Sequence, residues 1–293
     1  MDPLRLGAYI LPGDPTWLRS SLARYYDHLD TLVVPVPDDG RSWTGRPIPV
    51  QQCLTIIREL DTRGIVRTIT GRWNHPQDPM VAENQQRQAA IDAIQGVDWV
   101  LQIDNDELLP DLSALIHVLD VAAASGAPAV EWPMRVIFRE LRNGRYLEVV
   151  AADGGPRYDY PGPIAVRPDT RLSECRRSEG SWLRPVVRGD DRSLQVVRRP
   201  AALEQRETCL DVDQAILHNS WGRSAASIWR KVRSTAHQEG WRMIWYFGAV
   251  WWASPLTWRW LRNFHLFSRS LWPRLRVLDE SSTWLVDTRD RRR

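Results

Sequence analysis

The feature that most constrains this chain is an apolar stretch that stops on a group of acids. Residues Trp99 to Ile103 are mostly apolar, and Asp104, Asp106 and Glu107 follow at once. A short apolar run of this kind is typical of a buried parallel strand, and the carboxyl ends of such strands face the ligand crevice of an open α/β sheet. The stretch therefore predicts a central strand with a site at its end.

Three carboxylates this close repel one another when they lose water, so a countercharge is expected beside them. Mg²⁺ and Mn²⁺ fit best, because both prefer oxygen ligands and leave positions open for substrate phosphates. A calcium-binding loop fits poorly, since the glycine of the D-x-[DN]-x-[DN]-G pattern is missing. The alternative is a solvated loop that leads into the next helix, with Asp111 as its N-cap.

Composition narrows the classes of function. The formal net charge is +3, which does not indicate a dedicated nucleic-acid-binding protein, and no nucleic-acid partner is expected. The cysteines, Cys53, Cys175 and Cys209, are widely spaced, so they predict neither a disulfide framework nor a zinc site and fit a reducing compartment. The N-terminal apolar run, Leu6 to Leu11, lacks the features of a signal peptide, and we expect a cytoplasmic protein.

The apolar pattern alternates between strand and helix periods along most of the chain. Strands are expected over 4–11, 32–36, 65–70, 99–103 and 215–217, and helices over 17–26, 51–61, 80–95, 111–124 and 224–238. A hairpin is expected over 130–150, because Asn143-Gly144 is a strong turn signal between two strand-like runs. Residues 151–210 give no readable order. The alternation predicts an α/β fold with a mixed sheet flanked by helices.

The segment from 241 to 272 is rich in tryptophan, a residue that occurs 16 times in the chain. Its longest uncharged run, Met243 to Trp258, is shorter than the roughly 20 residues that a bilayer-spanning helix needs. We therefore expect amphipathic helices, which either cap the core or lie on a membrane surface.

Three motifs, taken in order, resemble the family 2 glycosyltransferases. Asp38-Asp39-Gly40-Arg41-Ser42 is similar to the V-D-D-G-S element of that family, and the segment from Arg87 to Gly96 is similar to its R-N-x-G...A-x-G segment, with Gln88 and Ala90 as departures. Asp104-Asn105-Asp106 matches its D-x-D motif. The resemblance is close over residues 4–112 and loose over 213–238. It implies the Rossmann-like GT-A fold, with a nucleotide-sugar half (1–112), an acceptor half (113–240) and a Trp-rich helical C-terminal region (241–293).

The resemblance also implies roles for individual residues. Nucleotide-sugar contacts would come from Leu11, Asp14, Asp39, Arg87, Asp104 and Lys231. Asp39 would bind the nucleobase, and Arg87 and Lys231 would contact the phosphates. Mn²⁺ or Mg²⁺ would be held by Asp104, Asp106 and His218. For each residue an ordinary structural role stays open, as a turn cap for Asp39, a core histidine for His218, or solvated helix charges for Arg87 and Lys231.

The implied function is metal-dependent transfer of a hexose from a nucleotide-diphospho-sugar to a glycan, lipid or small-molecule acceptor. Peripheral contact of the Trp-rich segment with the inner face of the membrane stays open beside its alternative, a cap on the core. An inverting enzyme needs a base, for which Asp191 is the candidate, with Asp153 and Asp159 as competitors. Two alternatives stay open. One is a nucleotidyltransferase, which would be expected to carry a Gly-rich basic loop after the first strand. The other is a non-catalytic module that binds sugar nucleotides or membranes.

Overall fold

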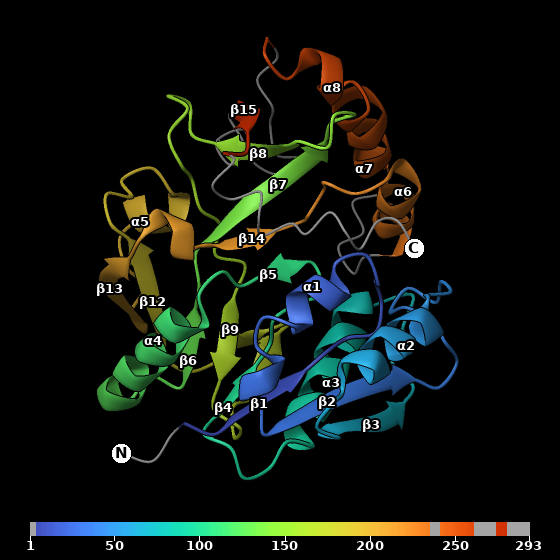
Figure 1. Ribbon diagram of the computed structural model, residues 1–293, viewed down its shortest axis with the longest axis vertical. Helices are drawn as coiled ribbons and strands as arrows, with labels where there is room; N and C mark the ends of the chain where they lie inside the picture. Colours follow the sequence, from blue (N-terminus) through green and yellow to red (C-terminus); the bar gives the residue numbers. More distant parts are fainter. Residues whose placement is uncertain (1–3, 235–240, 261–273, 280–293) are drawn as a thin grey trace.

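The computed structural model describes residues 4–234, 241–260 and 274–279; for residues 231–234 it describes the backbone alone. The chain forms two large sheets, which lie one above the other in Figure 1. The first has eight strands in the order β13 (Glu204–Leu210), β12 (Trp182–Val187), β6 (Ala129–Glu131), β9 (Pro163–Val166), β4 (Trp99–Leu101), β1 (Leu6–Tyr9), β2 (Thr31–Pro37) and β3 (Val66–Gly71). The second has five, in the order β15 (Arg274–Val277), β8 (Tyr146–Val150), β7 (Met134–Glu140), β14 (Ile216–His218) and β5 (Glu107–Leu108).

Helices cover both faces of the eight-stranded sheet. One face packs against α1 (Leu18–Leu22), α2 (Val50–Leu60) and α4 (Leu112–Ser125), and the other against α3 (Pro79–Asp92). The alternation of side chains along β1 produces this division. Leu6 and Ala8 pack on the face that α1, α2 and α4 cover, and Tyr9 packs on the face that α3 covers. The predicted α/β class, a mixed sheet flanked by helices, is confirmed.

Most of the elements expected from periodicity are present. β1 pairs in parallel with both β2 and β4, while β9 is antiparallel to β4 and β6, which makes the sheet mixed. The Asp111 carboxylate caps α4 by accepting a 3.0 Å hydrogen bond from the backbone N–H of Ala114. The Asp14 carboxylate accepts hydrogen bonds from the backbone N–H and the hydroxyl of Thr16, and α1 begins at Leu18.

The stretch from 151 to 210, which periodicity could not order, contains β9, β12, β13, the short helix α5 (Leu194–Val197) and a small hairpin. The hairpin consists of β10 (Leu172–Glu174) and β11 (Arg177–Ser178). The predicted acceptor half therefore contributes four strands, β6, β9, β12 and β13, to the eight-stranded sheet. The other four strands of this sheet come from the predicted nucleotide-sugar half. The boundary at residue 112 stays a prediction.

The C-terminal helices pack against the second sheet, at the upper right of Figure 1. They are α6 (Ala225–Ser234), α7 (Trp241–Trp245), the π-helical η3 (Tyr246–Trp251) and α8 (Ser254–Thr257). The predicted helical region also contains a strand, β15, which pairs with β8. Within the described ranges, every helix is too short or too polar to cross a bilayer. Residues 261–273 of the predicted Trp-rich segment lie outside the described part.

The absence of a side chain at Gly7 allows the loop after α3 to approach β1 closely. A Cβ atom at Gly7 would lie 2.6 Å from Ile94 Cγ2, whereas a Cβ atom at Gly248 would meet nothing within 4 Å. We expect Gly7→Ala to lower the free energy of unfolding by about 1–3 kcal/mol through overpacking. The matched variant Gly248→Ala should be neutral or raise it by roughly 0.5–1 kcal/mol. Urea denaturation measures both, and equal stability of the two variants would contradict the packing described.

Candidate functional site

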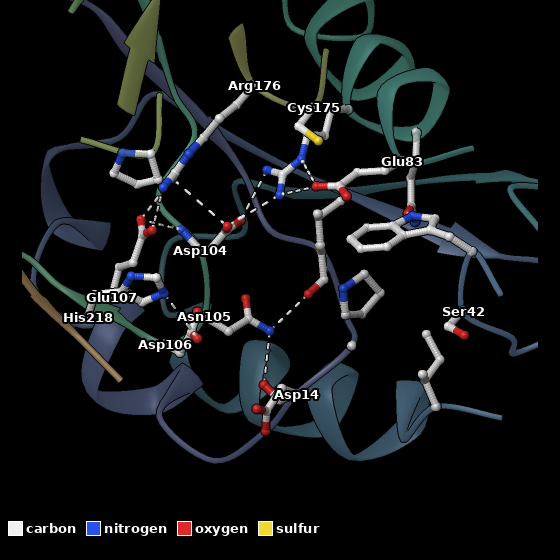
Figure 2. Close-up of a pocket in the computed structure, with 18 of the residues that line it drawn as sticks. Asp14, Ser42, Glu83, Asp104, Asn105, Asp106, Glu107, Cys175, Arg176 and His218 are labelled. Carbon is white, nitrogen blue, oxygen red and sulfur yellow. Dashed lines mark hydrogen bonds and ion pairs between the residues drawn. The ribbon is translucent and has the colours of Figure 1, made fainter. Parts of the chain in front are cut away.

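A pocket lies where β1, β2 and β4 end. Its cavity has a volume of about 460 Å³, and its walls come from the loops that follow these three strands, from the β10–β11 hairpin and from the start of α6. The carboxyl edge of parallel strands is the usual position of a ligand crevice in an α/β sheet. Figure 2 shows the acids that follow β4 directed into this space.

The Asp104 carboxylate is held between two buried arginines. Its oxygens lie 3.0 Å and 3.3 Å from the guanidinium of Arg87, and one lies 3.9 Å from that of Arg176. Burial by itself raises the pKa of Asp104, but the positive charges of Arg87 and Arg176 outweigh it and hold this pKa below its usual value. Asp104 is therefore ionised at neutral pH, and the expected countercharge is supplied here by arginine.

Arg87 is bound on all sides by the protein. Besides Asp104, its guanidinium donates to Glu83 at 3.0 Å and to the Tyr9 hydroxyl at 3.2 Å. Burial raises the pKa of Tyr9 to about 12, so the hydroxyl stays protonated and donates in turn to Gln102 Oε1 at 3.0 Å. This geometry favours a positioning role for Arg87 over the direct phosphate contact that the resemblance implies.

Arg176 is a site residue that sequence analysis missed. It binds Glu107 with two hydrogen bonds, of 2.6 Å and 3.0 Å, and both side chains are buried. Cys175 just before it has a φ of 52°, and this left-handed backbone lies at the turn between β10 and β11. The Gln102 amide fixes the same turn by donating to the carbonyl of Arg176 at 3.1 Å.

Asp106 and His218 come together across the pairing of β5 with β14. His218 is opposite Glu107 in that register, and His218 Nε2 lies 3.5 Å from Asp106 Oδ2. Asp106 also pairs with Arg223, whose guanidinium bridges it to Asp14. The predicted proximity of Asp106 and His218 is therefore present, and Arg223 is a second arginine that sequence analysis did not select.

The middle residue of the D-x-D motif ties two loops together. Asn105 Nδ2 donates to the carbonyls of Leu11 and Asp14, at 2.8 Å and 2.9 Å, so the loop after β1 is held against the loop after β4. These two bonds assign the amide orientation and leave Oδ1 as an acceptor. Asn105 Oδ1 is buried without a hydrogen-bond partner within the described structure, which leaves this acceptor for a ligand.

The described residues contain no cluster of three or more His, Cys, Asp or Glu side chains arranged to hold a metal ion. Of the three predicted ligands, Asp106 and His218 lie together, while Asp104 is directed toward the arginines. Two protein ligands still suit Mg²⁺ or Mn²⁺ when substrate phosphates complete the coordination shell. The metal stays a prediction, with Asp106 and His218 as the residues that fit it.

Two predicted site residues, Asp39 and Asp191, are not among the described residues that line the cavity. The Asp39 carboxylate accepts hydrogen bonds from the side chain of Asn74 and the backbone N–H of Arg41, although its neighbours Arg41, Ser42 and Trp43 do line the pocket. Asp191 is 77% exposed, pairs with Arg192 and lies outside the lining, so the structure gives its role as base no support. Lys231 is on α6, and its side chain lies outside the described part.

Trp43 is a further lining residue without a sequence signal. Its indole N–H donates a 2.7 Å hydrogen bond to Gln86 Oε1, and the Gln86 amide donates to the carbonyl of Pro35 at 2.8 Å. The half-buried ring is thus fixed at the pocket wall, where a flat aromatic surface can stack with a planar ligand group. One tryptophan among many does not stand out in a sequence.

Comparisons with known proteins do not assign a family. No model of a known protein family matches the chain, and no curated protein matches it significantly. Solved structures give distant similarities. A mannose-6-phosphate isomerase from Helicobacter pylori is 16% identical over 48% of this chain, which spans 58% of the isomerase, with a TM-score of 0.30. A CMP:2-keto-3-deoxy-manno-octonic acid synthetase in complex with CTP is 11% identical over 56% of this chain and 75% of its own length, with a TM-score of 0.33.

TM-scores this low support no conclusion about fold family or activity. The resemblance to family 2 glycosyltransferases is therefore not confirmed.

The Arg176–Glu107 pair can be tested against its neighbour in sequence. The Arg176 side chain is 6% exposed and that of Arg177 is 62% exposed. Arg176→Lys keeps the charge but loses the two-point contact, so we expect the free energy of unfolding to fall by roughly 1–3 kcal/mol. Arg177→Lys should change it by less than about 0.5 kcal/mol. Denaturant titration compares them, and equal losses would show that the buried pair does not matter for stability.

Proposed function

We propose that the pocket binds a nucleotide-diphospho-sugar and that the protein transfers the sugar to an acceptor. The observation that supports this most strongly is the convergence of six predicted site residues on one cavity at the carboxyl edge of the sheet: Leu11, Asp14, Arg87, Asp104, Asp106 and His218. They come from segments that are far apart in the sequence.

The charges of the pocket are distributed in the way such a ligand requires. In its interior, the carboxylates of Asp14, Glu83, Asp104, Asp106 and Glu107 outnumber the guanidiniums of Arg87, Arg176 and Arg223. This excess negative charge favours a divalent cation. Three exposed arginines, Arg41, Arg177 and Arg230, line the same cavity and are available for phosphate oxygens.

In the proposed reaction the bond from the anomeric carbon to the diphosphate breaks while the acceptor oxygen attacks that carbon. A cation held by Asp106 and His218 would offset the negative charge that grows on the leaving diphosphate. Arg176 and Arg87 hold Asp104 in place, and Trp43 offers a surface for the nucleobase. Glu174 is the exposed carboxylate of the lining, and its ion pair with Arg177 is long, at 3.7 Å, so we propose it as the base in place of Asp191.

The second candidate is a nucleotidyltransferase, the class of the synthetase named above. The arginines of the lining are compatible with it, since they would suit a triphosphate as well as a diphosphate. The loop after β1, Leu11-Pro12-Gly13-Asp14, lacks the basic residues and repeated glycines expected of a triphosphate loop.

Metal-dependent nucleotide binding is the first test. With UDP, GDP or TDP and Mn²⁺ at 100 times the dissociation constant, the preferred nucleotide should stabilise the protein by about 2.7 kcal/mol, measured by thermal unfolding. Asp106→Asn should abolish the part of this gain that depends on Mn²⁺. The control Asp120→Asn changes an exposed acid on α4 and should keep the full gain. Retention of the metal-dependent gain in Asp106→Asn would place the metal elsewhere.

The products separate the two enzyme classes. A transferase that is offered a labelled nucleotide-diphospho-sugar without acceptor should slowly release free sugar and nucleoside diphosphate. A nucleotidyltransferase should instead release pyrophosphate from a nucleoside triphosphate and a sugar phosphate. Chromatography of the labelled products distinguishes these results. Nucleotide binding without either product would favour the non-catalytic alternative.

A further inference from the structure

The C-terminal helical segment from Trp241 to Trp260 has two apolar faces. One face packs on the second sheet through Tyr246 and Trp251, which are fully buried, and through the partly buried Met243, Phe247 and Val250. The Trp251 indole N–H donates to the carbonyls of Phe138 and Trp221, at 3.1 Å and 2.9 Å. This face attaches the segment to the second sheet, so the segment covers the apolar core there.

The other face is exposed and is also apolar. Its large side chains come from α7, from the turn between η3 and α8, and from α8 and the turn that follows it, and all are exposed to solvent. They are Trp241, Ile244, Trp245, Trp252, Leu256 and Trp260, with exposed fractions from 48% to 79%. Gly248 and Ala249 fill the interval between Trp245 and Trp252 and are exposed as well. An ordinary surface helix would carry polar residues at these positions.

The charges of this segment have one sign. From Trp241 to Trp260 the charged residues are Arg242 and Arg259, both exposed, and the segment contains no acidic residue. Tryptophan and arginine together are typical of surfaces that enter the headgroup region of a bilayer, because the indole has an apolar body with a polar N–H and the guanidinium pairs with lipid phosphate.

We propose that the exposed face of Trp241–Trp260 is a docking surface for an anionic lipid bilayer. The segment lies in the plane of the headgroups with its tryptophans inserted, while its inner face keeps it attached to the second sheet. Within the described residues, no helix could span the bilayer. The surface is independent of the nucleotide chemistry proposed above, because none of its large exposed side chains lines the pocket.

The position of α6 connects this surface to the pocket. Arg230 on α6 lines the cavity. The ring centroid of Trp229, the residue before it, lies 5.7 Å from that of Phe247 in the docking segment. The membrane contact would therefore place the cavity near the lipid headgroups. If the proposed function holds, this favours a lipid-borne acceptor.

Flotation of the full chain with vesicles tests the proposal. The protein should float with vesicles of phosphatidylcholine and phosphatidylglycerol, and less with phosphatidylcholine alone. The triple variant Trp245→Gln, Trp252→Gln and Trp260→Gln should bind the anionic vesicles at least about tenfold more weakly. The matched control is the double variant Val197→Gln and Leu203→Gln. It replaces apolar side chains outside this segment that are 65% and 51% exposed, and it should bind the vesicles like the unaltered protein.

Two further measurements make the result decisive. Brominated lipids should quench tryptophan fluorescence in the unaltered protein and much less in the triple variant. The thermal unfolding midpoint of the triple variant should fall only slightly, since the replaced rings are 48% to 79% exposed; loss of the Trp252 ring contacts with Phe247 and Trp251 would account for a small decrease. Failure of the unaltered protein to bind either vesicle would overturn the proposal. A second result would also overturn it: the unaltered protein forms a dimer and binds no vesicles, and the triple variant is monomeric. A second copy of the chain would then cover this face. Neither result bears on the nucleotide-binding test.

Discussion

The interaction on which the rest of this structure depends is the pairing of buried acids with buried arginines at the end of β4. Glu107 begins β5 in the second sheet, whereas Asp104 precedes it on the chain leaving the first sheet. Arg87 reaches them from α3 and Arg176 from the β10–β11 hairpin. Removal of one partner from such a pair leaves a desolvated charge, so these contacts hold four separate elements in one arrangement.

This arrangement also creates the chemistry of the pocket. The arginines neutralise only part of the acidic charge, and the remaining acids lie beside His218 and the buried Asn105 oxygen. The exposed arginines stand farther out, at the cavity wall. A pocket with acids inside and arginines outside can bind a cation and phosphates at the same time, which a uniformly basic or acidic pocket cannot do.

The second sheet connects the pocket to the exposed tryptophans. β14 delivers His218 to the pocket and pairs with β7, and Phe138 of β7 packs against Tyr246 of the C-terminal helices. The same small sheet therefore carries His218 of the site and also the apolar residues on which the C-terminal helices pack; these helices lie beside it at the upper right of Figure 1. Each of these functions needs a rigid support, and the shared sheet supplies it.

The sequence by itself determined the alternation of strands and helices in the first part of the chain and the position of the acids after β4. Both are encoded locally, in apolar period and in capping residues such as Asp111. It also singled out Asp106 and His218, which the structure brings within 3.5 Å of each other.

Tertiary structure alone decided which countercharge meets Asp104, that Trp43 faces the cavity, and that Asp191 does not. Arg176 lies 69 positions after Glu107, on a hairpin of very short strands, so no local pattern reveals the pairing. Periodicity likewise shows that a helix is apolar on two faces, but only packing decides which face is buried. For Trp241–Trp260, contacts with β7 and β8 made that choice.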